Sequence, residues 1–511
     1  MDTIIFSLIT AISGWCLLRW MRTKPSFNRP VPRVEFDDGD NSRVRYARES
    51  EKLIAKGYQD YLRKGQAFSM RNVVDDRRSL VFLPRKYLDE VKNAPDSELS
   101  FPKFMENLSI LRHVGGPLIT DELCHATRTD LNRALPALIF TARLTQQMYE
   151  GCLTGCREFI PECPDWTSIM PYPLLLQIFN RIGQRVLVGP ELARNQEWLD
   201  LTQNYTTSLL QGTNTVRAKY TPSLRWLAKY FERDVKMVYK ERQQAAALLA
   251  PVLRNRLAAR AENQKQTVTD QHEDAIEWLI DDYHRKGRKV TAQEIAQDQL
   301  GLTLAAIHNT AATVLSTLYD LIDHPASLED IRTEIRQVIE QHGGGFDRAA
   351  LQSLRHLDSF MTESLRMHSM PQVTVQRLAL VPKTFHDGFH IPAGTQVMFA
   401  NRPLNHDPDV YPDPERFDPK RFYDDRDSGG NNKQHHFATV SDDSVTFGSG
   451  FHACPGRFFA QDVIKLLLAS LLIRYDFKFA EEGQKRPVDM TDNLVVYPNA
   501  TVPILIKELS F

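Results

Sequence analysis

Residues 447–460 read FGSGFHACPGRFFA, with a single cysteine, Cys454, among three glycines, a proline and a histidine, directly before an apolar helical pattern. A glycine-rich loop ahead of a helix suits two kinds of chemistry. It can hold a phosphate at the helix N-terminus, or it can present the cysteine sulfur to a metal. The rest of the chain has to separate these two interpretations.

The first interpretation is nucleotide binding. Gly448, Gly450 and Ala453 satisfy the pattern G-x-G-x-x-A, and the preceding SVTF is compatible with a strand. The pattern lies about sixty residues from the C-terminus, however, and no series of alternating strands and helices surrounds it. A nucleotide-binding dehydrogenase therefore stays a remote alternative.

The second interpretation uses the cysteine. A thiolate can bind haem iron, and it needs hydrogen-bond donors around its sulfur and shielding from water. Backbone N–H groups of the glycines can supply the donors, and Phe447 can pack beside the sulfur. Pro455 in a first helical turn would start a helix whose positive end lies near the thiolate. This interpretation explains every unusual residue of the stretch.

Hydrophobic periodicity predicts mostly helices. Residues 130–250 are largely helical in pattern, and the longest predicted helix covers residues 291–323, opening with a capping box from Thr291 to Glu294. Another helix is expected over residues 357–368. Short strands are expected within residues 373–400 and near the C-terminus. The fold class is therefore mainly α with a smaller β region.

The N-terminus predicts a membrane anchor. Residues 3–18 carry no charge, and extended to Trp20 they would form a helix of about 27 Å. Arg19 and Arg22 follow, which favours a cytoplasmic location for the rest of the chain. The basic start and cleavage site of a signal peptide are absent. We therefore expect a single transmembrane helix over residues 1–22, a proline-rich hinge over 23–33 and a catalytic domain over 34–511.

The net charge and the cysteine spacing give no support for a nucleic-acid partner or a cysteine metal site. The net charge of −1 gives no reason to expect nucleic acid as a partner. The six cysteines form no C-x-x-C pair. Cys152 and Cys156 share a helical face, but without further ligands nearby we predict them to be core residues.

The sequence around Cys454, including His452, resembles the haem-binding signature of the cytochrome P450 family, F-x-x-G-x-[RH]-x-C-x-G. The matching residues are Phe447, Gly450, His452, Cys454 and Gly456. Two further family elements follow the family's order: E-x-x-R at Glu363 and Arg366, and P-E-R-F at residues 414–417. The resemblance spans essentially the whole chain. The sequence FHACPGRFFA, together with AAIHNT upstream, is most similar to fungal members that modify terpenoids and related secondary metabolites.

The resemblance implies haem b as cofactor, with Cys454 as the ligand of its iron. It implies that His452 hydrogen-bonds a haem propionate and that Arg377 is a second propionate partner, with an ordinary surface arginine as the alternative. It also implies that Arg416 of P-E-R-F joins the E-x-x-R pair in the core. The family's W-x-x-x-R is not found. His125 is a candidate substitute for it, with a satisfied core histidine as the favoured alternative.

The distal helix departs from the family pattern [AG]-G-x-[DE]-T-[TS], whose acid and alcohol relay protons during dioxygen activation. This chain has AAIHNT, so His308 replaces the acid and Asn309 the threonine. Histidine can still relay a proton near neutral pH. A water chain through His308 and Thr310 is one solution, and help from a substrate hydroxyl is another. A register slipped by one residue, with Thr310 at the alcohol position, fits less well.

The resemblance further implies a monooxygenase that takes electrons from NADPH through NADPH–cytochrome P450 reductase, with cytochrome b5 as a second donor, and that uses O2. It implies anchorage in the endoplasmic reticulum membrane with the catalytic domain facing the cytoplasm. The substrate cavity is expected within residues 100–117, the distal helix, and residues 370–375 and 493–498. These are mostly apolar and predict an apolar small molecule as substrate.

Alternatives remain open from the residues alone. Asn309 leaves room for desaturation, rearrangement, dehydration or ring formation in place of simple hydroxylation. An isomerase or a peroxide-using enzyme would keep the haem but turn over without a reductase. A non-enzymatic haem sensor or carrier is more distant, because the expected apolar cavity and the anchor argue against it.

Overall fold

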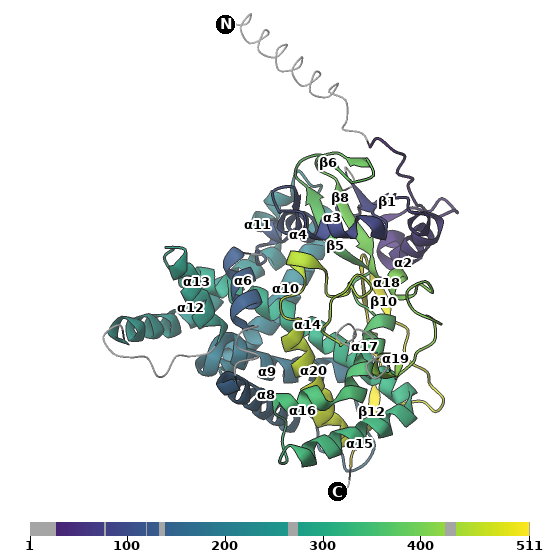
Figure 1. Cartoon of the computed structure of the whole chain (residues 1–511). Coiled ribbons are helices and arrows are strands. Elements are labelled where there is room, and N and C mark those ends of the chain that lie inside the picture. The colour runs from purple at the N-terminus through teal and green to yellow at the C-terminus, as the bar shows by residue number, and fades with distance from the viewer. Residues whose placement is uncertain are drawn as a thin grey trace, which may run out of the picture.

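The structure is a computed structural model that describes residues 27–75, 78–118, 120–131, 138–263, 274–424 and 436–509. Helices form most of it, and the strands gather mainly in a smaller region at one end (Figure 1). The predicted fold class, mainly α with a smaller β region, is confirmed. The predicted membrane anchor lies outside the described residues. Within those residues, no helix combines the length and the apolar composition needed to cross a membrane.

The helices surround one long central helix, α14 (Figure 1). The α-helices of the described residues are α2 Arg43–Asp60, α3 Leu88–Lys92, α4 Phe101–Ser109, α5 Leu111–Val114, α6 Asp121–His125, α8 Leu138–Phe159, α9 Pro171–Ala193, α10 Gln196–Lys219, α11 Ala228–Phe231, α12 Arg233–Asn263, α13 Ala275–Arg285, α14 Ala292–Asp323, α15 Pro325–Gln341, α16 Arg348–Ser353, α17 Arg355–Met367, α18 Asn401–Asn405, α19 Arg421–Asp424 and α20 Arg457–Leu472.

The strands form small sheets with mostly antiparallel pairing. The largest has the order β1 Phe68–Arg71, β2 Ser79–Phe82, β8 Gln396–Ala400, β5 Val373–Ala379 and β3 Leu99–Ser100. A second has the order β4 Thr167–Ile169, β12 Ile504–Glu508 and β9 Tyr475–Phe479. Two hairpins join β6 Lys383–Thr384 to β7 His390–Ile391 and β10 Met490–Asp492 to β11 Val495–Tyr497. Only β2 and β8 pair in parallel among the described strands, so no doubly wound nucleotide-binding sheet is built there.

Helix α14 begins as the capping box predicts. The Thr291 hydroxyl accepts a hydrogen bond from the Glu294 N–H at 3.3 Å, which satisfies one of the free donors of the first turn. With 32 residues the helix is about 48 Å long. It packs against α9, α12, α17 and α20 and is buried along most of its length. It therefore crosses the body and can present side chains to a central site.

A buried ion-pair network ties α17 to the segment that follows α18. Arg366 donates from Nε and Nη2 to the two carboxylate oxygens of Glu363 at 2.7 and 2.8 Å, and its Nη1 reaches the Asn405 carbonyl at 2.7 Å. The third member is Arg421, whose Nε lies 3.2 Å from Glu363. The expectation for Arg416 was wrong: its side chain is exposed, and only its carbonyl takes part.

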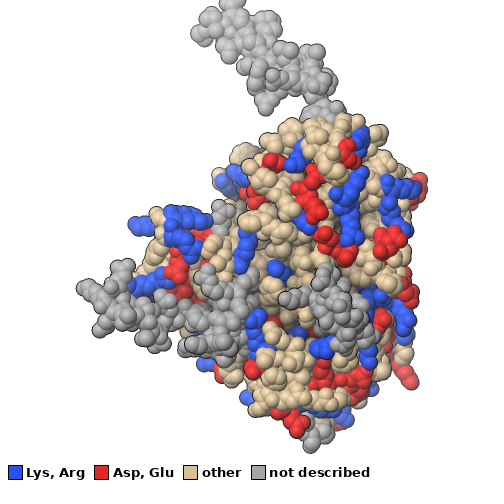
Figure 2. Space-filling model, in the orientation of Figure 1, with Lys and Arg blue, Asp and Glu red and all other residues tan. Residues whose placement is uncertain are grey.

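The surface carries both signs of charge. On the face in Figure 2, Lys and Arg side chains alternate with Asp and Glu over the described residues, without a large patch of one sign. Residues 27–33, the described part of the predicted hinge, contact the body. The Ser69 N–H donates to the Pro32 carbonyl at 2.8 Å, and the Phe27 ring stacks on Phe389.

Candidate active site

The cysteine loop is held by its own backbone. The Cys454 N–H donates to the Phe447 carbonyl at 2.7 Å, and the loop turns at Gly448 and Gly450, whose φ angles are +77° and +66°. Only glycine adopts such positive φ angles without a steric penalty. A Cβ on Gly450 would also lie 2.5 Å from the Lys92 carbonyl oxygen. The signature glycine at 450 is therefore needed for both conformation and space.

The sulfur of Cys454 lies at the start of α20. Burial raises the pKa of the thiol, while the N–H groups of Gly456 and Arg457 and the Arg457 charge oppose that rise. Arg457 also donates from Nη1 to the Cys454 carbonyl at 2.8 Å. Pro455 lies in the turn just before the helix, not inside its first turn. Donors at a helix N-terminus favour the thiolate form, which is the form that binds metals.

Arg377 is a buried cation with unused donors. Its side chain is 1% exposed on β5, so the alternative of an ordinary surface arginine was wrong. Its Nη1 donates to the Gln376 carbonyl, whereas its buried Nε and Nη2 have no partner among the described residues. This burial lowers its pKa to about 10. An uncompensated buried guanidinium is costly, so the site is built for an anionic group.

His452 lies beside Arg377 but already has an acid partner. Its Nε2 is 3.0 Å from Asp96 Oδ1, and its ring is 5.2 Å from the ring of Phe101. Burial, and next the charge of Arg377, lower its pKa. A hydrogen bond to a further acceptor, such as a haem propionate, would have to use Nδ1. Its role at the cofactor stays a prediction.

Arg128 is a second cation near this loop that the sequence reasoning missed. Its guanidinium carbon lies 3.8 Å from the centre of the Phe451 ring, and its charge contributes to lowering the pKa of His452. At the positions of W-x-x-x-R this chain has Cys124 in place of the tryptophan, while the arginine is present as Arg128. His125 is turned elsewhere, with Nδ1 3.2 Å from Asp282.

These residues fit a haem. A cysteine sulfur with backbone N–H donors can serve as the ligand of the iron, and the unused donors of Arg377 suit a carboxylate group of the cofactor. Cys152 and Cys156, in contrast, are fully buried in the core between α8 and its neighbours, as predicted.

The side chains in the distal segment of α14, residues 305–310, lie on different faces of the helix. Ala305 and Asn309 are exposed although they lie in the middle of a mostly buried helix, which indicates that this face borders a hollow. Asn309 Nδ2 donates to the Ala305 carbonyl at 3.2 Å. Thr310 is buried and its hydroxyl donates to the Ala306 carbonyl. The structure thus does not bring His308, Asn309 and Thr310 together, and Asn309 is the side chain on the open face.

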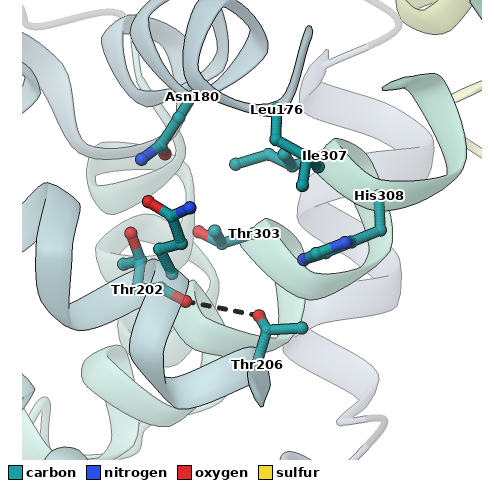
Figure 3. A pocket seen from close by; sticks show the side chains of 8 residues that line it. Leu176, Asn180, Thr202, Thr206, Thr303, Ile307 and His308 are labelled. Atoms are coloured by element: carbon teal, nitrogen blue, oxygen red, sulfur yellow. Dashed lines mark hydrogen bonds between the residues drawn. The ribbon is translucent and has the colours of Figure 1, made fainter. Parts of the chain in front are cut away.

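His308 points away from that face, into a small cavity between α14 and helices α9 and α10 (Figure 3). The space open to the centre of a water molecule is about 20 Å³, enough for one water. The polar residues that line it are Asn180, Thr202, Gln203, Thr206, Thr303 and His308. Gln203, which contributes to the cavity from α10, is also exposed at the surface.

Tyr172 fixes one nitrogen of His308. The two side chains meet at 3.3 Å between the Tyr172 hydroxyl and His308 Nδ1. Burial raises the pKa of Tyr172 to about 12, so the hydroxyl keeps its proton and can donate it to Nδ1. Burial lowers the pKa of His308, which favours the neutral imidazole. The neutral imidazole can accept the Tyr172 hydrogen bond at Nδ1 and can donate one from Nε2.

Comparison with known proteins agrees with this geometry. The sequence model of the cytochrome P450 family matches residues 182–505. Cytochrome P450 monooxygenase cheE of Chaetomium globosum is 38% identical, over 97% of this chain and 94% of its own length. Pyrichalasin C-7 hydroxylase of Pyricularia grisea is 36% identical, over 93% of this chain and 92% of its own.

A solved structure shares the fold. Retinoic-acid-bound cyanobacterial CYP120A1 superposes with a TM-score of 0.65 and 20% identity, covering 94% of this chain and all of that chain. Together with the family match and the fungal relatives, this shows that the chain is a monooxygenase of the cytochrome P450 family, the haem-thiolate enzymes in which a cysteine binds the haem iron.

Proposed function

We propose that this monooxygenase oxidises an apolar fungal secondary metabolite, a terpenoid or a related compound. The observation that carries the proposal is the Cys454 loop, where helix N-terminal N–H groups support the sulfur. The relative from Pyricularia grisea, pyrichalasin C-7 hydroxylase, supports hydroxylation as the reaction and adds pyrichalasin-like compounds to the candidate substrates.

The chain's own residues would act as follows. Cys454 would bind the haem iron, and Arg377 would neutralise a propionate, with His452 Nδ1 and Arg128 as further candidates. Phe447, Gly450 and Gly456 would hold the loop that carries the sulfur. The bound haem would supply dioxygen activation. Asn309 would face the reacting centre from α14, while His308 would take protons from the cavity behind it.

Electrons would come from NADPH through NADPH–cytochrome P450 reductase, with cytochrome b5 as a second donor. Residues 1–22 would anchor the chain in the endoplasmic reticulum membrane, with residues 34–511 in the cytoplasm. The uncharged segment 3–18 followed by Arg19 and Arg22 supports this placement.

Desaturation, rearrangement, dehydration or ring formation is the second candidate, favoured by Asn309. An asparagine on the exposed face of α14 offers an amide in place of a hydroxyl, and its Nδ2 is engaged by the Ala305 carbonyl. Turnover of dehydroabietane under ¹⁸O2, with NADPH and a co-expressed reductase, separates the two. Hydroxylation adds one ¹⁸O to the product, whereas desaturation adds none; absence of any reductase-dependent product would contradict both.

Replacing His308 should uncouple the reaction. We expect His308→Ala to lower the product formed per NADPH about tenfold and to raise hydrogen peroxide, because general acid–base help at a proton-transfer step is worth at least that much. Tyr172→Phe should have a smaller effect in the same direction, since it removes only the partner of Nδ1. Unchanged coupling in His308→Ala would show that protons arrive by another path.

A further inference from the structure

Four ionisable side chains, all largely buried, form a closed ring beside the C-terminal end of α14. His368, the residue that follows α17, has Nε2 3.3 Å from Asp320 Oδ1 and Nδ1 3.3 Å from Asp489 Oδ2. Arg486 closes the ring, because its Nε lies 2.6 Å from Asp320 Oδ1 and its Nη1 lies 2.9 Å from Asp489 Oδ1. None of the four side chains is more than 18% exposed. Each carboxylate therefore lies between one histidine nitrogen and the guanidinium.

The two carboxylates determine the protonation of His368. A neutral imidazole has one N–H and one bare nitrogen, and a bare nitrogen repels a carboxylate oxygen. Only the imidazolium has a proton for both Asp320 and Asp489. Charge balance leads to the same result, since two carboxylates and Arg486 leave one negative charge that a protonated His368 cancels. Burial opposes this charge, but the carboxylates outweigh burial and raise the pKa of His368 above its usual 6.5.

The other polar groups around the ring carry no charge. Ser316 on α14 accepts a hydrogen bond from Arg486 Nη2 at 2.8 Å, and the Ser364 hydroxyl on α17 donates to Asp320 Oδ2 at 2.6 Å. Burial raises the pKa of Tyr319, next to Asp320 on α14, to about 12, so this hydroxyl stays neutral. The net charge of the ring therefore depends on the histidine.

Two further ion pairs in the neighbouring chain segments are balanced by themselves. Arg402, which donates to the Ser369 carbonyl, lies 3.0 Å from Glu51. Lys485 is largely exposed and lies 3.7 Å from Asp323. Neither pair supplies the positive charge that the ring lacks when its histidine is neutral.

The ring attaches an irregular segment to two core helices. Two of its members lie on α14 and at the end of α17, helices whose apolar side chains belong to the main core. The other two belong to residues 484–489, which form neither helix nor strand and lead directly into the β10–β11 hairpin. Within this segment Pro487 is buried, whereas Val488 is 84% exposed. Loss of one charge from the ring should therefore release the segment before it disturbs the helices.

We propose that the ring is a pH-sensitive clamp, in which protonated His368 holds residues 484–489 and the start of the β10–β11 hairpin on α14. Loss of the proton leaves one buried negative charge uncompensated, which favours local opening. Because the pKa of His368 is raised in the folded protein, the clamp is complete below pH 6.5 and is lost as the pH rises through the folded value. The hairpin includes most of residues 493–498, which the sequence predicts to line the substrate cavity.

Hydrogen–deuterium exchange of the full-length holoenzyme, followed by mass spectrometry, tests the clamp. Labelling at about pH 6 and about pH 8.5, with times scaled for the intrinsic exchange rate, should show peptides of residues 484–497 exchanging about tenfold faster at the higher pH. Peptides of the buried helix α20 should show no such change.

Three variants separate the clamp from a general effect of pH. His368→Gln removes the imidazolium, so residues 484–497 should exchange rapidly at both pH values. Asp489→Asn removes the carboxylate that requires the second proton, so exchange should no longer depend on pH. His284→Gln replaces an exposed histidine on α13 and should behave like wild type.

Equal exchange of residues 484–497 at both pH values in wild type would overturn the clamp. A pH dependence that persists in His368→Gln or in Asp489→Asn would overturn it as well. The same holds for an equal increase in the α20 peptides, which would mark loosening of the whole protein instead of a local release. If His368→Gln does not fold, wild type and Asp489→Asn decide between these outcomes.

Discussion

Glu363→Gln should lower the free energy of unfolding by about 3–5 kcal/mol, because it breaks a buried ion pair and leaves the other charges uncompensated. Glu363 is fully buried and accepts hydrogen bonds from Arg366, Arg421 and the Asp418 N–H. A neutral amide would replace one acceptor by a donor that faces two arginines. Urea unfolding followed by far-ultraviolet circular dichroism measures the change.

The same network supplies a discriminating pair of controls. Arg421→Gln should also destabilise strongly, since its Nε contacts Glu363 at 3.2 Å. Arg416→Gln should have little effect, because only the Arg416 carbonyl is used and a substitution keeps it. An Arg416→Gln variant as unstable as Arg421→Gln would contradict this account of the core.

Gly450→Ala should reduce haem occupancy of the purified protein and destabilise it by about 2–4 kcal/mol. The substitution adds a side chain at φ +66° and places its Cβ 2.5 Å from the Lys92 carbonyl oxygen, a backbone atom that cannot move cheaply. Relief requires the 447–456 loop to shift, and this moves the sulfur of Cys454. The haem-to-protein ratio and the urea midpoint report the two effects.

Gly345→Ala is the control for glycine replacement as such. Its φ is outside the left-handed region, and a Cβ there meets no atom within 4 Å. It should retain the haem content and the midpoint of the wild type. A Gly450→Ala protein that also retained both would show that the loop tolerates a Cβ and that its glycine is not required by the geometry.

Local chemistry in the sequence was sufficient for several parts of the structure. The Thr291 capping box set the start of α14, since a cap depends on neighbours within one turn. The signature spacing around Cys454 predicted a loop whose backbone N–H groups support the sulfur, because adjacent residues determine it. The i, i+3 spacing of Glu363 and Arg366 likewise predicted a pair on one helical face.

Contacts between distant segments could not be obtained in this way. Arg416 lies inside the P-E-R-F motif and Arg421 lies four residues after it. Only the path of the chain decides which of the two side chains turns inward. The partner of His452 is Asp96, more than three hundred residues away, and no local pattern links them. Arg128 was missed because the expected tryptophan is replaced by Cys124. Its proximity to Phe451 depends on tertiary packing.

The most direct test of the central claim is the absorption spectrum of the dithionite-reduced, full-length protein under carbon monoxide, recorded for wild type, Cys454→Ala and Cys124→Ala. Thiolate ligation by Cys454 predicts a strongly red-shifted Soret band in wild type and Cys124→Ala that is lost in Cys454→Ala. A wild type without haem, or a red-shifted band that survives in Cys454→Ala, would contradict the assignment of Cys454 as the ligand of the haem iron.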